Sequence, residues 1–148
     1  MARPDLLKLD DFLCFAIYSA GHAFNRVYKP LLDALSLTYP QYLVMVALWE
    51  CDGQTVSQVG DRLLLESSTL TPLLKRLESA GLVRRERVRE DERQVKVHLT
   101  ETGGLLKKRA AKIPSAIGCA ADLAVEDVKN LTTEISKLRA KLLKTKAA

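Results

Sequence analysis

Apolar residues recur every three or four positions between Leu9 and Val27, which predicts an amphipathic helix of roughly five turns. Pro30 and the segment 38–40 are expected to interrupt the helical pattern. The following segment, 42–49, is almost wholly apolar and predicts a buried helix. The Asp52-Gly53 dipeptide ends that helix in a turn.

Two shorter helices are predicted next. Thr55-Val56-Ser57-Gln58 has the capping-box pattern, so we expect a helix from there to about Leu64. A second helix is expected to open at Glu66-Ser67-Ser68-Thr69 and to end at Gly81. Its apolar positions share one face and are the candidate core residues Leu70, Leu73, Leu74 and Leu77.

The hydrophobic period changes to two after Leu82-Val83. Val95, Val97 and Leu99 alternate with polar residues, which predicts a strand with one buried face, and segment 85–88 is its expected antiparallel partner. Segment 89–93 forms the hairpin tip, and because it contains no Asn-Gly we expect a loop longer than two residues. The predicted fold is therefore mainly α with a small β-hairpin wing, a winged helix-turn-helix.

The C-terminal segment carries a second apolar seam. Its members recur at alternating steps of three and four and are Val128, Leu131, Ile135, Leu138 and Leu142. Packing within one chain is one explanation, but a single winged helix does not need this seam, so we favour a homodimer interface. Segment 124–127 lacks the Ser or Thr expected to cap this helix.

Positive charge is concentrated in one region and suggests a nucleic-acid partner. The chain has a net charge of +5, and residues 75–112 hold 12 Lys or Arg against 6 Asp or Glu. Cations at the second helix and at the wing suit major-groove and minor-groove contacts, respectively. Asp91 is expected to orient a wing arginine. The predicted DNA-binding residues are Ser67, Ser68, Thr69, Thr71, Lys75, Arg76, Arg87, Arg89 and Arg93. Taken singly, these residues also fit helix capping or a solvated surface.

Composition argues against several other classes of protein. With 148 residues the chain fits one domain. The sequence contains no run of about 18 apolar residues, which argues against a signal peptide or a membrane span. We therefore expect a cytoplasmic protein without membrane contact. Three dispersed cysteines argue against a structural disulfide framework. His22 and His98 are not spaced to converge with a cysteine, so we expect no metal. No enzyme motif or cofactor-binding motif is present, and we expect neither catalysis nor a cofactor.

Four segments together resemble the MarR family of bacterial transcription regulators. They are residues 59–63, residues 68–78, Gly81-Leu82-Val83, and Asp91-Glu92-Arg93 through Leu99-Thr100. The resemblance covers nearly all of residues 1–148. It implies a homodimeric transcription regulator, usually a repressor that binds operator DNA. It further implies dimerisation helices in residues 5–50 and 101–148, and a DNA-binding winged helix-turn-helix in residues 51–100.

Within that family, Leu13-Cys14-Phe15-Ala16 resembles the start of the organic hydroperoxide resistance regulators, the OhrR group. This resemblance implies that Cys14 senses an organic hydroperoxide. It also implies that two tyrosines beyond the first helix, Tyr28 and Tyr39, donate hydrogen bonds that stabilise its thiolate. Cys119 matches the second cysteine of the two-cysteine type, which implies an intersubunit disulfide that releases DNA.

Other interpretations of the thiols stay open at this stage. Free cysteines are often core residues, and Cys14 on a helix face fits that description. In that case a MarR-type repressor released by a small phenolic ligand would explain the remaining features. A thiol peroxidase is a further alternative, although it would not need the basic wing. We assign Cys51 a structural role.

Overall fold

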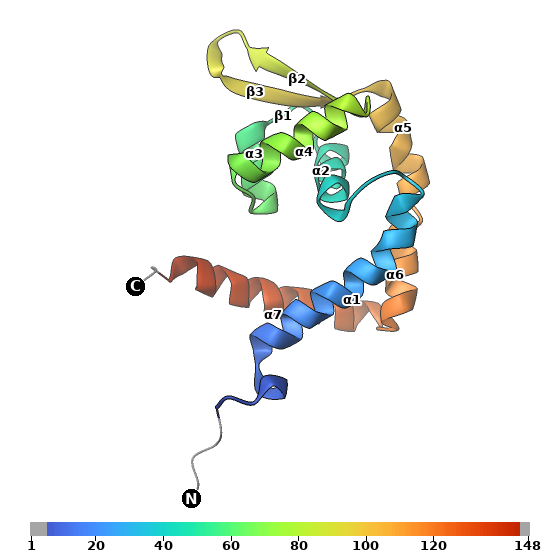
Figure 1. Ribbon diagram of the computed structural model, residues 1–148, viewed down its shortest axis with the longest axis vertical. Coiled ribbons are helices and arrows are strands. Elements are labelled where there is room, and N and C mark those ends of the chain that lie inside the picture. The colour runs from blue at the N-terminus through green and yellow to red at the C-terminus, as the bar shows by residue number, and fades with distance from the viewer. Residues whose placement is uncertain (1–5, 146–148) are drawn as a thin grey trace, which may run out of the picture. The chain divides into compact units, whose positions relative to one another are not determined.

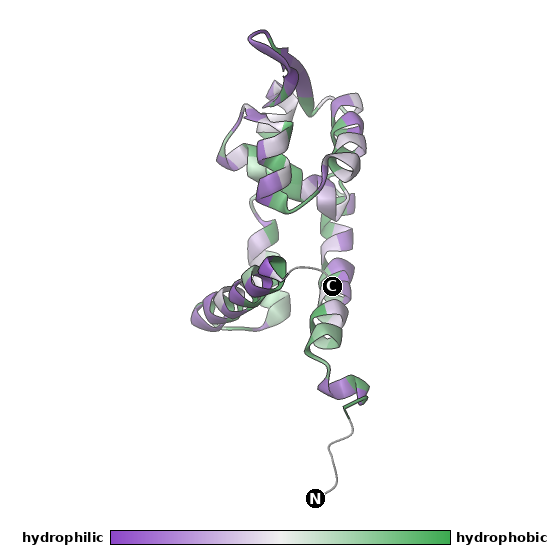
Figure 2. Ribbon diagram, turned by 90° about the vertical axis from the view of Figure 1, so that its left-hand side faces the viewer, coloured by the Kyte–Doolittle hydropathy of each residue, from purple (hydrophilic) through white to green (hydrophobic). Residues whose placement is uncertain are grey.

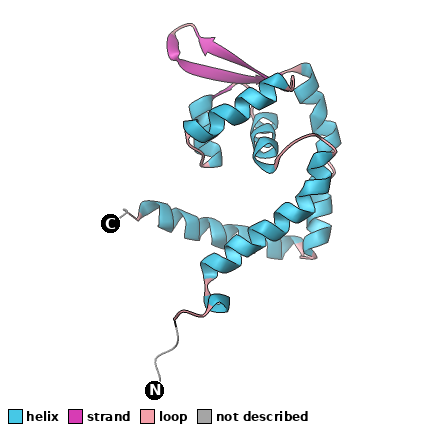
Figure 3. Ribbon diagram, in the orientation of Figure 1, coloured by secondary structure: helices cyan, strands magenta, loops and turns pink. Residues whose placement is uncertain are grey.

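The computed structural model of the chain describes residues 6–145, and its parts are labelled in Figure 1. The described residues form two compact units, which divide between Ile113 and Pro114. The predicted dimerisation segments reach residue 5 and residues 146–148, which lie outside the described residues. Figure 3 shows helices throughout both units and strands only in one small sheet.

The first helix differs in its bounds from the prediction. A short 3-10 turn, η1 (Leu9–Asp11), precedes α1 (Leu13–Asp33), which continues past Pro30. The proline removes one N–H donor, but the last turn is retained because Leu32 is buried within it at 2% exposure. The Ala34 N–H closes this turn by donating to the Pro30 carbonyl at 3.4 Å. The expected interruption at Pro30 is therefore wrong.

The next three helices form the core of the first unit. They are α2 (Tyr39–Glu50), α3 (Val56–Leu63) and α4 (Ser67–Ser79). The predicted capping box at Thr55 is confirmed, because its hydroxyl accepts from the Gln58 N–H while the Gln58 side chain accepts from the Thr55 N–H. The apolar faces of α2 and α4 are buried, as predicted, and their fully buried members are Val44, Met45, Leu48, Leu70, Leu74 and Leu77.

Gly81 ends α4 in the predicted way. It has φ +76°, a left-handed conformation that glycine adopts without strain. The Gly81 N–H donates to the Glu78 carbonyl at 2.9 Å, and the Leu82 N–H donates to the Leu77 carbonyl at 3.0 Å. These two bonds satisfy the last carbonyls of the helix and direct the chain into the wing.

The wing is an antiparallel hairpin of β2 (Val83–Val88) and β3 (Asp91–Leu99), joined by β1 (Gln54–Thr55) in the order β1-β3-β2. Val83 pairs with Leu99 and Arg87 with Val95, but Val88 pairs with Asp91. The expectation of a longer loop is therefore wrong: two residues, 89 and 90, make the turn. The register shift between Arg87 and Val88 takes up the extra residues of β3 in the ladder, which explains why the charged segment does not form a loop.

Helix α5 (Glu101–Ala110) packs tightly against the base of the wing. A Cβ atom at Gly103 would lie 2.0 Å from the Leu82 carbonyl oxygen, so only glycine fits there. The Trp49 indole N–H donates to the Gly103 carbonyl at 2.9 Å. This bond joins α2 to α5 across 54 positions of sequence.

The second unit is built from α6 (Ile113–Ala121), which begins at the boundary, and α7 (Val125–Lys144). No side chain caps α7 at Ala124, which agrees with the missing Ser or Thr. The predicted seam is largely exposed in the single chain, with Leu131 at 51% and Ile135 at 46%. Among residues 6–145, none of the helices combines the length and apolar character that crossing a membrane requires.

Candidate DNA-binding surface and thiol sites

The first turns of α4 present polar side chains on the face opposite the core. Ser67, Ser68 and Thr69 are exposed, whereas Leu70 is completely buried. Thr71 is half-buried, and the exposed cations Lys75 and Arg76 follow within the next two turns. The helix therefore separates its packing face from a face of hydroxyls and positive charge, as the sequence pattern predicts. Hydroxyl groups and cations are suitable donors for base edges and phosphates.

The wing tip presents the predicted arginines, and much of the hairpin is hydrophilic in Figure 2. Arg87, Arg89 and Arg93 are exposed. The Arg87 guanidinium donates to the Glu92 carbonyl at 3.1 Å. Asp91 accepts a hydrogen bond from the backbone N–H of Arg93 at 3.1 Å, so it fixes the backbone on which Arg93 stands. No ion pair between Asp91 and a guanidinium occurs among residues 6–145.

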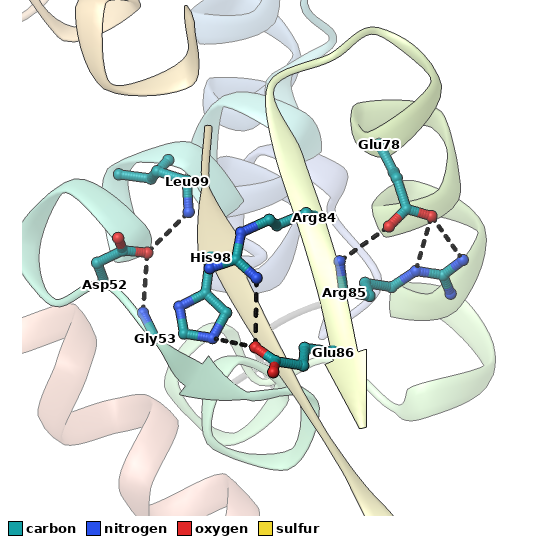
Figure 4. A network of polar contacts seen from close by, with 8 residues as sticks. All are labelled: Asp52, Gly53, Glu78, Arg84, Arg85, Glu86, His98 and Leu99. Atoms are coloured by element: carbon teal, nitrogen blue, oxygen red, sulfur yellow. Dashed lines mark hydrogen bonds and ion pairs between the residues drawn. The ribbon is translucent and has the colours of Figure 1, made fainter. Parts of the chain in front are cut away.

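A carboxylate that the sequence did not single out joins α4 to the wing. Glu78 accepts from the Arg85 side chain at 3.3 Å (Nε) and 3.1 Å (Nη2), and from the Arg85 backbone N–H at 2.8 Å (Figure 4). The hydrogen bonds from the Arg85 side chain, and then that from its backbone, hold the pKa of Glu78 below its ordinary value of 4.5. A local sequence pattern does not predict this pair, because the helix end and Gly81 lie between its members.

A second carboxylate holds the other strand of the wing. Asp52 Oδ1 accepts from the Gly53 N–H and from the Leu99 N–H, each at 2.8 Å (Figure 4). On the adjacent surface, Glu86 accepts from the Arg84 guanidinium at 3.2 Å and lies 3.6 Å from His98 Nε2. The basic segment thus divides into cations paired at the base of the wing and arginines presented near its tip.

Cys14 is the second residue of α1 and is exposed. Its neighbours on the helix include Leu13 at 61% exposure, Ile17 at 38% and Tyr18 at 64%. In the single chain the thiol is therefore not a core residue, which removes the packing interpretation for this chain taken alone.

The two predicted supporting tyrosines lie together but away from Cys14. Tyr28 and Tyr39 have ring centroids 4.8 Å apart, and the Tyr42 ring lies near both, at 5.9 Å and 6.4 Å, with its plane tilted to theirs. Burial, then the neighbouring Tyr39 and Tyr42, raises the pKa of Tyr28 to about 12. Burial also raises the pKa of Tyr39 above its usual 10.0. Both phenols are therefore protonated at neutral pH and able to donate a hydrogen bond.

Tyr28 lies within α1 and not beyond it, which corrects the expected placement. Cys14 and Tyr28 are both residues of this continuous helix. At about 1.5 Å of rise per residue their α-carbons are about 21 Å apart along the axis. A phenol cannot bridge that distance, so Tyr28 does not reach the Cys14 of its own chain.

The other two thiols are also exposed. Cys119 lies in α6, in the second unit. Cys51 follows the last residue of α2, where its backbone N–H donates to the Ala47 carbonyl and its sulfur lies 3.9 Å from the Asp52 carbonyl oxygen. Within the part of the chain that is described, no three His, Cys, Asp or Glu residues are placed to hold a metal ion.

Comparison with known proteins relates this arrangement to transcription regulators. The sequence profile of the family described as transcriptional regulator SarA/Rot matches residues 26–109. The chain is 47% identical over 140 residues to the HTH-type transcriptional regulator TtmR of Methylorubrum extorquens, covering 95% of this chain and 72% of TtmR. It is 46% identical over 134 residues to the organic hydroperoxide resistance transcriptional regulator of Bacillus subtilis, covering 90% of this chain and 91% of that protein.

A solved structure shows a similar fold at the level of the whole chain. AbfR in its reduced form, bound to DNA, superposes with a TM-score of 0.77 at 36% identity and covers 93% of this chain and 96% of its own. The family profile match over residues 26–109 includes residues 51–100, the segment in which the sequence predicts the winged helix-turn-helix. The chain therefore belongs to the SarA/Rot-type, MarR-like winged-helix family of transcriptional regulators, together with the organic hydroperoxide resistance regulators.

Proposed function

We propose that this regulator is a homodimeric repressor that binds operator DNA while Cys14 is reduced and leaves it after Cys14 has reacted with an organic hydroperoxide. The observation that carries the proposal is the exposed thiol of Cys14 on α1, in a chain 46% identical to an organic hydroperoxide resistance regulator. The polar face of α4 supplies the major-groove contacts, and the wing arginines supply the minor-groove contacts.

The dimer is proposed from apolar side chains that the single chain leaves uncovered. On α1 they include Leu13 and Phe24, and on α7 they include Leu131 and Ile135. Exposed apolar seams of this kind are stabilised by burial against a second helix. Two copies then place their α4 helices in successive major grooves of a near-palindromic operator, roughly 34 Å apart.

The same dimer supplies the tyrosines that one chain cannot. Because Tyr28 is too far along α1 to reach its own Cys14, we assign the thiolate-supporting hydrogen bonds to Tyr28 and Tyr39 of the partner subunit. Their neighbouring rings bring two phenols to one place, and both phenols are protonated at neutral pH. Donation from neutral phenols favours the thiolate, which is the reactive form of cysteine.

The Cys14 thiolate attacks the terminal, hydroxyl-bearing oxygen of the hydroperoxide. The O–O bond breaks, the alkoxide leaves and takes up a proton to become an alcohol, and Cys14 becomes a sulfenic acid. The Cys119 thiol of the partner subunit then attacks the sulfenic sulfur, which forms a disulfide and releases water. The disulfide constrains the two chains. The distance between their α4 helices then no longer matches the distance between successive major grooves of the operator.

Solved structures of AbfR include an overoxidised form and a disulfide form. At 36% identity, overoxidised AbfR is bound to DNA, as reduced AbfR is. The disulfide form of AbfR superposes on this chain with a lower TM-score, 0.63. An overoxidised form of AbfR thus still binds DNA. For this chain we accordingly place the release at disulfide formation.

The test combines operator release with non-reducing gels after a small dose of organic hydroperoxide. We expect a disulfide-linked dimer and release for the wild type and for Cys51→Ser, which removes the third exposed thiol. Cys14→Ser abolishes both, and Cys119→Ser keeps DNA bound. Release of Cys14→Ser by peroxide would refute the switch, and its release by a phenolic compound instead would favour a ligand-controlled repressor. Turnover of peroxide with a reductant would favour a thiol peroxidase.

A further inference from the structure

The Glu78–Arg85 pair lies between the two parts of the DNA-binding surface. Glu78 is in the last turn of α4, at the end opposite Ser67 and Ser68. Arg85 is the third residue of β2, close to the base of the wing. Their contact uses both carboxylate oxygens, the guanidinium and a backbone amide, and the two side chains are partly shielded at 38% and 27% exposure.

We propose that Glu78 is a positioning residue for operator recognition: it fixes the angle of the wing relative to α4, so that the helix and the wing tip contact one operator together. This inference rests on the proposed DNA-binding function. It assigns the Arg85 guanidinium to a contact within the protein and not to a DNA phosphate, although Arg85 lies in the most basic segment of the chain.

A small change at the Glu78–Arg85 contact would move the wing tip by a large distance. Arg85 and Arg89 are four positions apart, so the tip lies about 13 Å from the contact along the strand. A rotation of about 20° at the base would then displace the tip by about 4 to 5 Å, which is more than a hydrogen bond tolerates. A planar guanidinium bound through two nitrogens resists such a rotation better than a single bond does.

The second strand is held independently of Glu78. Asp52 receives the Leu99 N–H at 2.8 Å, and β1 pairs with β3 through Gln54 and Val97. Since these contacts and the β2–β3 ladder remain when Glu78 is replaced, we expect the hairpin to stay folded. Instead, the hairpin becomes freer to rotate about the end of α4. This weakens the contacts between the wing and DNA and leaves the contacts between α4 and DNA in place.

The experiment uses full-length dimer and two duplexes. One carries the site that the wild-type chain selects from random DNA, and in the other the A·T pairs flanking that site, under the wing tip, are replaced by G·C. We expect the replacement to weaken wild-type binding by about tenfold or more. For Glu78→Ala the ratio of the two Kd values should fall to about twofold, because a loosely held wing no longer reads those pairs.

Glu86→Ala is the matched control. It also removes a wing glutamate that binds an arginine, but Glu86 contacts Arg84 and His98 within the sheet and does not reach α4. We expect its ratio to equal that of the wild type. Glu78→Gln keeps an acceptor for the Arg85 N–H and should give an intermediate ratio. Circular dichroism of each variant verifies that the chain is folded.

Arg85→Met distinguishes positioning from phosphate contact and retains the backbone bond to Glu78. If Arg85 only positions the wing, the ratio of the Kd values for the two duplexes falls. The slope of the logarithm of the binding constant against the logarithm of the salt concentration then stays the same. Arg89→Met, at an exposed tip arginine, should lower that slope by about one. A slope lowered by Arg85→Met, or an unchanged ratio for Glu78→Ala, would overturn the inference. Absence of wild-type DNA binding would overturn the proposed function, and this inference with it.

Discussion

Tyr28 of α1 and Tyr39, the first residue of α2, hold their rings with centroids 4.8 Å apart. The contact brings two phenols together at the junction of two helices, and Tyr42 closes the cluster from the next turn of α2. Because α1 separates this cluster from the Cys14 of the same chain, its proposed role in peroxide sensing depends on the partner subunit.

Tyr28→Phe removes one phenolic hydroxyl and keeps the aromatic ring in the cluster. We expect operator binding of the reduced protein to be unchanged, whereas oxidation of Cys14 by an organic hydroperoxide slows by about tenfold, the loss of one hydrogen bond to a charged group. The measurement is the second-order rate constant of thiol oxidation. Tyr42→Phe is the control, since Tyr42 lies in the same ring cluster but is not assigned a hydrogen bond to the thiolate. Equal slowing by both substitutions would contradict the assignment.

Gly103→Ala places a methyl group against backbone. A Cβ at this position would lie 2.0 Å from the Leu82 carbonyl oxygen, so α5 must move away from the wing base. We expect a loss of about 1–3 kcal/mol or more in the free energy of unfolding, measured by urea denaturation. Gly104→Ala, where the added Cβ would meet no atom within 4 Å beyond its chain neighbours and its own helix backbone, should instead add about 0.5–1 kcal/mol. A loss shared equally by both would show that the contact with Leu82 is not the cause.

The Glu78–Arg85 pair gives stability a defined dependence on pH. The pKa of Glu78 is lowered in the folded chain from 4.5, so the folded state binds its proton less readily than the unfolded state. The contribution is therefore present above pH 4.5 and is lost as the pH falls through the lowered pKa. We expect the unfolding free energies of the wild type and Glu78→Gln to differ at pH 7 and to converge in acid. A difference that is independent of pH would rule out the ion pair as its source.

Lys75→Ala tests the predicted DNA face of α4. Lys75 is exposed, whereas Leu74 beside it is buried, so the substitution removes a charge without disturbing the core. We expect the affinity for specific and non-specific duplexes to fall together and the salt slope to decrease by about one. Lys29→Ala, which removes an exposed lysine paired with Asp33 on α1, should leave that slope unaltered. Fluorescence anisotropy at several salt concentrations measures both.

Ile135→Glu tests the seam of α7. Ile135 is 46% exposed in the single chain, and a charge there cannot be buried in an interface without a partner. We expect the dimer to dissociate at micromolar concentration and operator affinity to fall at least tenfold, as measured by analytical ultracentrifugation and anisotropy. Thr133→Glu introduces the same charge on α7 outside the apolar seam. Dissociation caused by Thr133→Glu as strongly as by Ile135→Glu would argue against the seam as the interface.

Local patterns in the sequence determined most of the helices and much of the candidate DNA-binding surface. The capping box at Thr55, the buried leucines of α4 and the left-handed Gly81 all follow from interactions within a few residues, so spacing predicts them. Resemblance to a family added the candidate roles of Cys14 and Cys119, which no periodicity reveals.

Tertiary structure alone decided the features that depend on distant contacts. Burial of Leu32 keeps α1 helical past Pro30, and a register shift at Val88 shortens the wing turn to two residues. The Glu78–Arg85 and Trp49–Gly103 contacts join elements whose local sequences do not indicate each other. Local sequence determines which side chains a helix or strand can present. The packing of separate elements determines which side chains meet, because that depends on distances and angles set by the whole fold.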